Sequence, residues 1–219
     1  MTDTQQLFTD AFLAEIEDRK KRDGAYDPTE WTAGGRASKA WPKKEDASWW
    51  LTEGPKMVDS WCKWWSTMKT EGWTLWRTPQ GVPAIELEVF AEIGGQRFRC
   101  FIDAVFVDGD GDMVCIDWKS GREPTAPIQL GSYALAMEKT LGARPKLGAF
   151  YLARKGDLGH VYDLSIYTED VVGPWLQRAA EIEKQGLFIP HPSSLCSACS
   201  VREHCLIMGG EKADQVPSF

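Results

Sequence analysis

The stretch that decides the fold is RCFIDAVFVDGDGDMVCIDWKSG, residues 99–121. Two apolar runs flank the cluster DGDGD, which is the pattern of two β-strands joined by a turn. A turn centred on Asp110 places Asp103 opposite Asp117, and directly opposite side chains have Cβ atoms about 5 Å apart. Lys119 follows Asp117 by two residues and therefore points to the same face. The stretch thus gathers two carboxylates and an amine on one sheet.

The segment before it predicts a second hairpin. The runs AIELEVFAEI and QRFRCFIDAV are joined by Gly94 and Gly95, a pair typical of two-residue hairpin turns. That turn places Glu86 opposite Asp103, so that three carboxylates converge across three strands. A β-bulge would shift this register, and Glu88, on the same face as Glu86, is then the alternative.

Acidic side chains between these strands need a compensating charge. Phe101 and Val105 are expected to share the face of Asp103, and strands that are apolar on both faces are usually covered on both. Buried carboxylates lose hydration and repel one another. A hard divalent cation such as Mg²⁺, which commonly binds one or two carboxylates plus waters, would satisfy them. The alternative is a strand that ends in an ion pair between Asp117 and Lys119, with solvated acids nearby.

Length and composition indicate a globular chain of one domain, with or without appendages. The 219 residues are 43% hydrophobic and 26% charged, with a net charge of −7. This charge argues against a protein that binds nucleic acid by bulk electrostatics, but not against a nuclease with an acidic metal site. The sequence shows neither the pattern of a signal peptide nor a run of transmembrane length. We therefore expect a cytoplasmic protein without membrane association.

The order of the elements predicts an α/β fold. We expect three strands within residues 84–119, two more at 146–156 and 160–165, and helices over 4–22, 55–69, 127–140 and 168–186. Residues 23–48 read as an irregular connection. This order predicts a sheet with helices on both faces.

The first two helices carry apolar stripes. The stripe of the first helix is Leu7, Phe8, Phe12 and Ile16. We expect this helix to pack on its own domain, the alternative being an N-terminal arm that binds a partner. Nine of the eleven tryptophans lie between Trp31 and Trp76. In the second helix, which Pro55 is expected to open, Trp61 and Trp64 fall at helical spacing. They are expected to lie in the core, the alternative being stacking on nucleic-acid bases.

The last part of the chain contains a cysteine cluster. Its spacing, C-x2-C-x5-C, is formed by Cys196, Cys199 and Cys205. Thiolates favour iron–sulfur centres or zinc, and both usually take four protein ligands. Cys62 is a candidate fourth ligand, while His204 or His191 would suit zinc. Plain thiols are the third alternative. Cys100 and Cys115, within strands, are expected to be core residues.

Together these motifs resemble a known family. Glu86, Asp103 in F-I-D, Asp117 and Lys119 in I-D-W-K-S-G, and Gln129 and Tyr133 in Q-x-x-x-Y resemble the PD-(D/E)xK nucleases of the RecB type. They look closest to compact CRISPR-associated and phage-borne RecB-like exonucleases. The cysteine tail is similar to the C-terminal part of that family's iron–sulfur staple.

The resemblance implies an α/β, restriction-endonuclease-like fold, a mixed sheet flanked by helices. A helical, tryptophan-rich region over 1–78 would precede the nuclease core at 79–190 and the cysteine tail at 191–219. It implies a metal-dependent DNA nuclease, an exonuclease of DNA processing, recombination or repair. The DNA would be single-stranded or carry free ends, and a recombination or CRISPR-adaptation protein would be a partner. The alternatives are a catalytically silent nuclease fold that binds DNA or a protein, and a zinc-stabilised interaction module.

The resemblance also implies roles for residues. Glu86, Asp103 and Asp117 would bind Mg²⁺ or Mn²⁺, and Lys119 would orient the attacking water. Gln129 and Tyr133 would hold the site and the DNA strand. The three cysteines of the tail, with Cys62, would bind a 4Fe–4S cluster, with zinc as the alternative.

Overall fold

The computed structural model describes residues 3–23, 45–186, 196, 199 and 202–212. Its contacts divide the chain into two compact units, Met57–Ile182 on one hand and Met1–Lys56 with Glu183–Phe219 on the other. The predicted irregular connection falls mostly on residues 24–44, which lie outside the described part. The first unit holds the sheet and every predicted site residue except the cysteines of the tail.

Helix α1 spans Asp3–Asp23 and bears out the first predicted helix. The rings of Phe8 and Phe12 stack with centroids 5.7 Å apart, and Phe8 packs against Gly54 of the same unit. Ile16 is buried, but Leu7 faces solvent. The predicted stripe is therefore too wide, because only the side of α1 that carries Phe8 and Ile16 is covered.

Helix α2 spans Ala47–Thr70 and is longer than predicted. Asp46 caps its start, since the Asp46 Oδ1 atom accepts a hydrogen bond from the Trp49 amide at 2.9 Å. Pro55 therefore lies inside the helix, and its expected place in the first turn is wrong. The cap upstream lets the helix begin earlier, although proline cannot donate its hydrogen bond in the interior.

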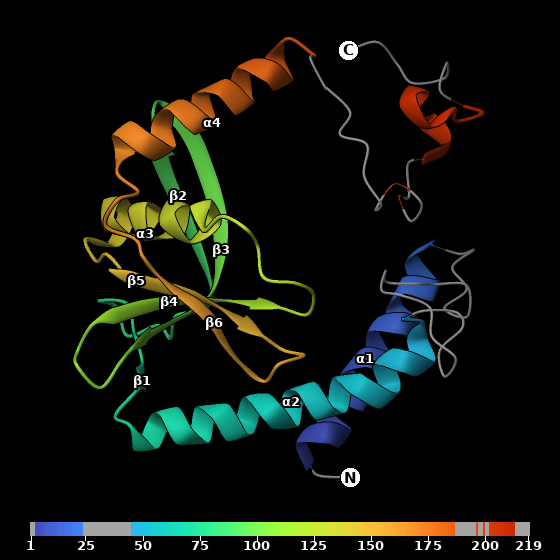
Figure 1. The fold of residues 1–219 in the computed structure, drawn as a ribbon, viewed down its shortest axis with the longest axis horizontal. Coiled ribbons are helices and arrows are strands. Elements are labelled where there is room, and N and C mark those ends of the chain that lie inside the picture. The colour runs from blue at the N-terminus through green and yellow to red at the C-terminus, as the bar shows by residue number, and fades with distance from the viewer. Residues whose placement is uncertain (1–2, 24–44, 187–195, 197–198, 200–201, 213–219) are drawn as a thin grey trace. The chain divides into compact units, whose positions relative to one another are not determined.

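The sheet is mixed and flanked by helices, which confirms the predicted α/β, restriction-endonuclease-like fold (Figure 1). Its strands are β1 (Thr74–Leu75), β2 (Ile85–Ile93), β3 (Gln96–Val107), β4 (Met113–Lys119), β5 (Leu147–Leu152) and β6 (Asp157–Asp163). Their order is β1-β3-β4-β5-β6, with β2 also pairing with β3. Strands β4 and β5 are parallel, joined through helix α3 (Ile128–Leu141), and the other pairs are antiparallel. Strand β1, two residues long, carries too little pattern to be predicted.

Both hairpins have the predicted register. Leu87 pairs with Ile102 and Ile85 with Ala104, so Glu86 lies opposite Asp103. Ala104 in turn pairs with Ile116, which sets Asp103 across from Asp117. The pairs on either side of Glu86 have the same register, so no β-bulge shifts the pairing of β2 with β3 at this position.

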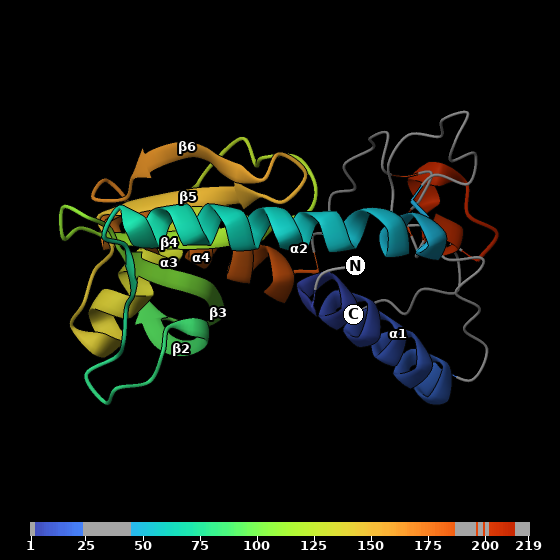
Figure 2. The same cartoon turned by 90° about the horizontal axis from the view of Figure 1, so that it is seen from below.

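Each face of the sheet has its own apolar core. On one face, Leu130 and Met137 of α3 belong to a buried cluster with Ile102 and Phe150. On the other face the aromatic stripe of α2 packs on the strands: the Trp61 ring centroid lies 4.9 Å from that of Tyr151 (Figure 2). The prediction that this stripe belongs to the core is confirmed.

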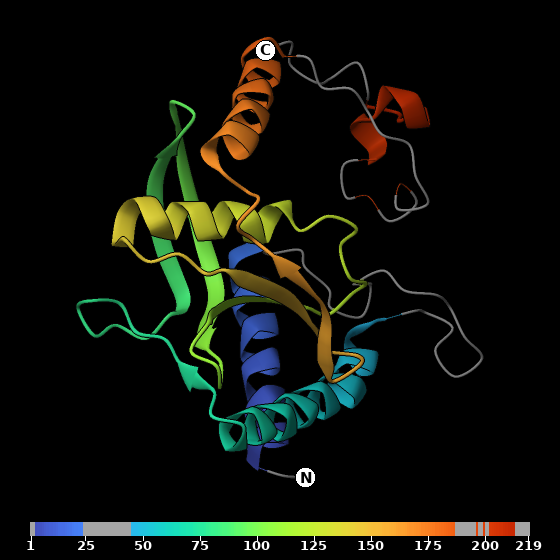
Figure 3. The same cartoon turned by 60° about the vertical axis from the view of Figure 1, so that its left-hand side comes forward.

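Strand β3 extends beyond the rest of the sheet. It pairs with β4 only from Ala104 to Val107, while its earlier residues pair with β2 and project as a two-stranded ribbon (Figure 3). We call β2 and residues 96–103 the β2–β3 arm. Its Phe101 is 46% exposed, whereas Val105 is fully buried. The expectation that Phe101 and Val105 share a covered face is wrong, because Val105 belongs to the cluster packed against α3, as do Cys100 and Ile102, whereas Phe101 lies on the open face of the arm.

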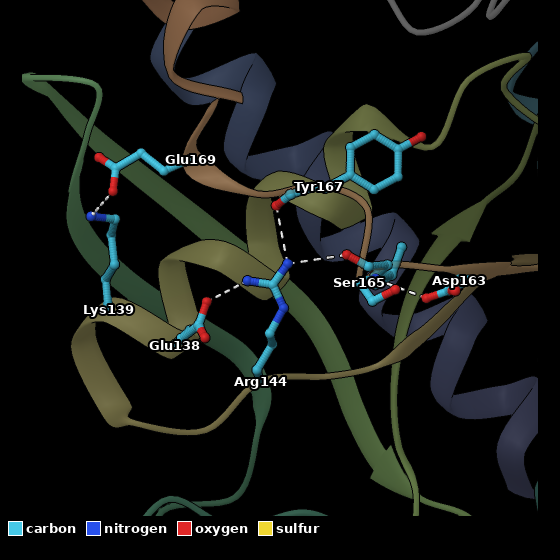
Figure 4. A network of polar contacts seen from close by, with 8 residues as sticks. Glu138, Lys139, Arg144, Asp163, Ser165, Tyr167 and Glu169 are labelled. Carbon is cyan, nitrogen blue, oxygen red and sulfur yellow. Dashed lines mark hydrogen bonds and ion pairs between the residues drawn. The ribbon is translucent and has the colours of Figure 1, made fainter. Parts of the chain in front are cut away.

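Helix α4 spans Glu169–Lys184 and contains Pro174, as predicted. It meets the turn of the β2–β3 arm through two glycines, since a Cβ on Gly94 would lie 2.7 Å from the Gly173 Cα. The Gln177 Nε2 atom also donates to the Gly94 carbonyl at 2.6 Å. A side-chain carboxylate at the start of α4, that of Glu169, pairs with Lys139 of α3 at 2.5 Å (Figure 4). The first turns of α4 are thus held between the arm and α3.

An arginine secures the connection into α4. The Arg144 Nη2 atom donates to the carbonyls of Leu164 and Tyr167 at 3.1 and 3.0 Å, and Arg144 pairs with Glu138 (Figure 4).

In the tail, the described residues form two short 3-10 helices, Arg202–His204 and Leu206–Met208. None of the helices within the described ranges has both the length and the apolar character needed to cross a membrane.

Candidate active site

The candidate active site lies where β4 ends, beside the start of α3. Side chains alternate along β4, so Trp118 packs against Trp61 of α2 while Asp117 and Lys119 face α3. Asp117 is only 2% exposed. Its Oδ2 atom is 2.5 Å from Lys119 Nζ, a contact that has the distance of an ion pair but lacks hydrogen-bond geometry. The D-x-K motif therefore forms a buried charge pair at a strand end.

Gln129 connects the members of the site. Its Nε2 atom donates to Asp117 Oδ1 at 2.8 Å and contacts the Tyr133 hydroxyl at 2.7 Å. Its Oε1 atom accepts from Lys119 Nζ at 3.1 Å. Gln129 and Tyr133 share one face of α3 because they are four residues apart. One amide thus fixes the positions of the carboxylate, the amine and the phenol.

The site changes the pKa of two of its groups. Burial raises the pKa of the Asp117 carboxyl above its usual value, and the charge of Lys119 lowers it in part. The carboxylates of Asp103 and Glu86 raise this pKa further, which shows that both lie within electrostatic reach of Asp117. Burial also raises the pKa of Tyr133 to about 12, so Tyr133 is a neutral hydrogen-bonding group at physiological pH.

Asp103 and Glu86 complete the acidic group from β3 and β2. The Asp103 Oδ2 atom accepts a hydrogen bond from the Trp118 amide at 2.7 Å, which ties β3 to β4 just beyond their regular pairing. Glu86 has a φ of +48°, the one positive φ of a non-glycine residue in the described part of the chain. Such a backbone conformation is strained and tends to occur at functional positions.

Glu88, the alternative to Glu86, has a different environment. Its Oε1 atom pairs with Arg99 on the open face of the β2–β3 arm, 2.5 Å from Nη2 and 2.6 Å from Nε. Glu88 does not contribute to the shifted pKa of Asp117, whereas Glu86 does. The geometry therefore favours Glu86 as the third acidic group of the site.

The donor chemistry of the site suits a hard divalent cation. Carboxylate oxygens, which Glu86, Asp103 and Asp117 carry, are the donors that such cations take, and the buried Asp117 Oδ2 atom has an ion pair with Lys119 but no hydrogen bond. Among the described residues, however, no three side chains of the metal-binding types lie close enough together to hold an ion. Lys119 instead compensates the charge of Asp117, and a cation bound there would compete with this amine.

The cysteines divide into core residues and tail residues. Cys100 and Cys115 are buried as predicted, and burial raises the pKa of the Cys100 thiol to about 12. In the tail, the Cys199 amide donates to the Cys196 carbonyl at 3.4 Å. Cys205 follows the first 3-10 helix. A metal centre at these cysteines, with Cys62 or a histidine as fourth ligand, stays a prediction, and His191 lies outside the described residues.

Sequence reasoning missed some members of the site. The partner of Asp103 is the backbone amide of Trp118, and a backbone donor leaves no signature in residue type. The ring of Phe150, 5.6 Å from Lys119 Nζ, comes from the parallel neighbour β5, which sequence spacing does not align with β4. The sequence pattern also predicted that Phe101 and Val105 share a covered face, and so it did not predict that Phe101 is exposed beside the site.

The fold and the site together define the class. A mixed sheet carries Glu86 near the start of β2, Asp103 within β3 and the D-x-K pair at the end of β4, with Q-x-x-x-Y on the adjacent helix. The sequence profile of the PD-(D/E)XK nuclease superfamily matches residues 9–206. The chain belongs to this superfamily.

Two curated phage proteins are similar in sequence. The Gene 69 protein of Mycobacterium phage D29 is 35% identical over 160 residues, covering 70% of this chain and 58% of that protein. The Gene 69 protein of Mycobacterium phage L5 is 33% identical over 178 residues, covering 76% of this chain and 57% of that protein. The chain therefore spans less than two thirds of the length of these relatives.

A solved structure resembles the chain more distantly. It comes from Eubacterium rectale and is described as a "Putative exonuclease"; the match has a TM-score of 0.46 and 13% identity, and covers 93% of this chain and 75% of that one.

Proposed function

We propose that this chain is a metal-dependent deoxyribonuclease, an exonuclease that hydrolyses phosphodiester bonds during DNA processing, recombination or repair. The observation that carries the proposal is the connected polar group of Lys119, Asp117, Gln129 and Tyr133, with Asp103 and Glu86 on the neighbouring strands β3 and β2. A cytoplasmic location and a recombination or CRISPR-adaptation partner belong to the same proposal.

The metal ligands in this proposal are Glu86, Asp103 and Asp117, with Mg²⁺ or Mn²⁺ as the ion. Support comes from Asp103 and Glu86, whose carboxylates both raise the pKa of Asp117, and from the buried Asp117 Oδ2 atom, whose contact with Lys119 Nζ is an ion pair without hydrogen-bond geometry. A divalent cation bound there would supply charge neutralisation at the phosphate and a water of lowered pKa.

The other residues act through charge and position. Lys119, already held by the Gln129 amide, is placed to orient the attacking water and to stabilise negative charge that develops in the transition state. Gln129 keeps Asp117 and Lys119 in register, and Tyr133 keeps the orientation of that amide. Since Tyr133 stays neutral, it can donate a hydrogen bond to a phosphate oxygen but does not act as a base.

The test is digestion of end-labelled DNA. Single-stranded and double-stranded oligonucleotides, each labelled at the 5′ or the 3′ end, are incubated with Mg²⁺, with Mn²⁺ or with a chelator. We expect stepwise shortening from one end with either metal and none with the chelator. If neither substrate is shortened with either metal, the chain is a catalytically silent member of the superfamily that binds DNA or a protein.

The metal site has a test that does not depend on activity. Asp103→Asn removes one proposed ligand but keeps an oxygen that can accept from the Trp118 amide. Isothermal calorimetry with Mn²⁺ should show weaker binding to Asp103→Asn than to the wild-type chain. Equal affinities would show that Asp103 is not a ligand.

For the tail we propose a 4Fe–4S cluster held by Cys196, Cys199 and Cys205, with Cys62 as the fourth ligand. The support is the cysteine spacing and the hydrogen bond from the Cys199 amide to the Cys196 carbonyl. Protein purified without oxygen should be brown and contain iron and sulfide. Stoichiometric zinc without iron would establish the zinc alternative, and no metal at all would leave plain thiols.

A further inference from the structure

A hollow of about 450 Å³ adjoins the candidate active site and has no role in the chemistry proposed above. Its volume lies in the range of about 300–1,000 Å³ that is usual for small-ligand pockets. Among the residues that line it are Phe98, Arg99, Phe101, Gln129, Tyr133 and Trp175. Two of them, Gln129 and Tyr133, also belong to the hydrogen-bonded group around Asp117. The hollow is therefore continuous with the candidate active site.

The hollow exists because β3 begins several residues before the part that pairs with β4. Pairing with β4 begins at Ala104, so the preceding part of β3 borders the start of α3 instead of a strand. Helix α4 contributes Trp175 to the lining of the hollow, two residues after Gly173, which contacts Gly94. That contact, together with the ion pair of Glu169 and Lys139, fixes the helix turn that carries Trp175 (Figure 4).

The lining has the chemistry of a nucleotide site. Trp175 is 53% exposed and Phe101 46% exposed, and both residues line the hollow. Large exposed aromatic side chains next to each other usually mark a binding surface. The Arg99 guanidinium lies 4.9 Å from the Phe101 ring centroid and is ion-paired with Glu88, so a phosphate that contacts Arg99 would compete with this carboxylate.

We propose that this hollow binds the unpaired base of a nucleotide next to the scissile phosphate, stacked on Trp175 and Phe101, with Arg99 contacting a backbone phosphate. This inference rests on the proposed nuclease function and assigns residues that would hold a single-stranded end of its DNA. Aromatic platforms beside a cation are the usual means of holding single strands, because every base has a face that can stack. A base inside a duplex is already stacked and paired, so it would have to leave the helix to enter.

The test measures binding without cleavage. A single-stranded oligonucleotide with 2-aminopurine at its terminal positions is titrated with protein in buffer containing a chelator. The wild-type chain should quench the probe, because stacking on an aromatic ring quenches 2-aminopurine. Trp175→Ala and Phe101→Ala should each weaken binding roughly 5- to 100-fold, the range that corresponds to loss of one stacking contact. Trp175→Phe should retain most of the affinity, and a blunt duplex should bind more weakly than the single strand.

Two variants serve as matched controls. Phe90→Ala removes an exposed phenylalanine that also contacts Arg99, at 5.4 Å, but lies outside the hollow. Ile182→Ala removes an exposed apolar side chain of α4 two turns beyond Trp175. Both should bind the single strand within twofold of the wild-type chain, and melting temperatures should show that all variants fold.

The outcomes separate this inference from the proposed function. If the wild-type chain cleaves DNA but Trp175→Ala and Phe101→Ala bind the probe as it does, the base site is wrong and the nuclease proposal stands. Cleavage without any binding in the chelator also overturns the base site. If the wild-type chain neither binds nor cleaves, both proposals fall. Equal losses in Phe90→Ala would assign binding to the open face of the arm instead.

Discussion

The centre of the sheet and the β2–β3 arm are built from similar strand sequences but have different surroundings. At the centre, Phe150 is fully buried between α3 and its neighbouring strands. On the arm, Phe90 is 60% exposed, because α3 covers one face and the described residues of the same unit leave the other open. The centre contributes stability and the arm contributes accessible surface. The candidate active site lies at the boundary between them, where Asp103 of the arm meets Asp117 of the centre.

The largest expected effect tests this contrast directly. Phe150→Ala should lower the free energy of unfolding by about 3–5 kcal/mol, since it leaves a cavity in a packed core. The matched change Phe90→Ala should lower it by less than about 1 kcal/mol, because the ring is mostly in water already. Urea unfolding followed by circular dichroism measures both. Similar losses would show that the arm is covered as fully as the centre.

The second largest effect is a loss of cleavage, expected at the boundary between the centre of the sheet and the arm. Lys119→Ala should reduce Mg²⁺-dependent cleavage by about 10²–10³-fold, the usual consequence of removing a group that stabilises transition-state charge. The fold should remain, because Lys119 ends a strand. Lys146→Ala, which removes an exposed lysine paired with Asp112 away from the site, is the control and should cleave normally. If Lys119→Ala cleaves DNA at the wild-type rate, Lys119 has no part in the mechanism.

A smaller effect is expected at the tip of the arm. Gly94→Ala should destabilise the fold by about 1–3 kcal/mol, because the φ of Gly94 is +59° and a Cβ would meet the Gly173 Cα at 2.7 Å. Gly95 has a similar φ, +73°, but its Cβ would lie in open space. Gly95→Ala should therefore lose only the stability that the strained backbone conformation costs. Thermal unfolding compares them. If both variants lose the same stability, the contact between the arm and α4 contributes nothing.

The smallest effect is a pH dependence. Burial raises the pKa of Asp117, so the folded chain holds this proton more tightly than the unfolded chain does. Ionising Asp117 therefore opposes folding, and this loss of stability begins as pH rises through the usual carboxyl range and is complete above the raised pKa. Asp117→Asn, which cannot ionise, should gain stability relative to the metal-free wild-type chain over this window. A difference in melting temperature that is constant with pH would contradict this.

The local arrangement of the site could be predicted from the sequence. The turns at Gly94-Gly95 and at DGDGD set the register of two hairpins, and register alone aligns Glu86, Asp103 and Asp117. The spacing of Gln129 and Tyr133 likewise places both on one face of α3. These predictions hold because hairpin register and helix periodicity depend on residues close together in the chain.

The surroundings of the same residues were decided by the tertiary structure. Asp117 is buried because α3 and β5 cover it, and Phe101 is exposed because α2 stops short of the arm. The strained backbone of Glu86 and the place of Trp175 beside Gln129 likewise depend on contacts between distant segments. A repeating pattern of apolar residues tells which side chains share a face, but burial depends on what packs against that face. The sequence by itself determined which groups meet, and only the packing of distant helices decided which of them are shielded from water and which remain open to a substrate.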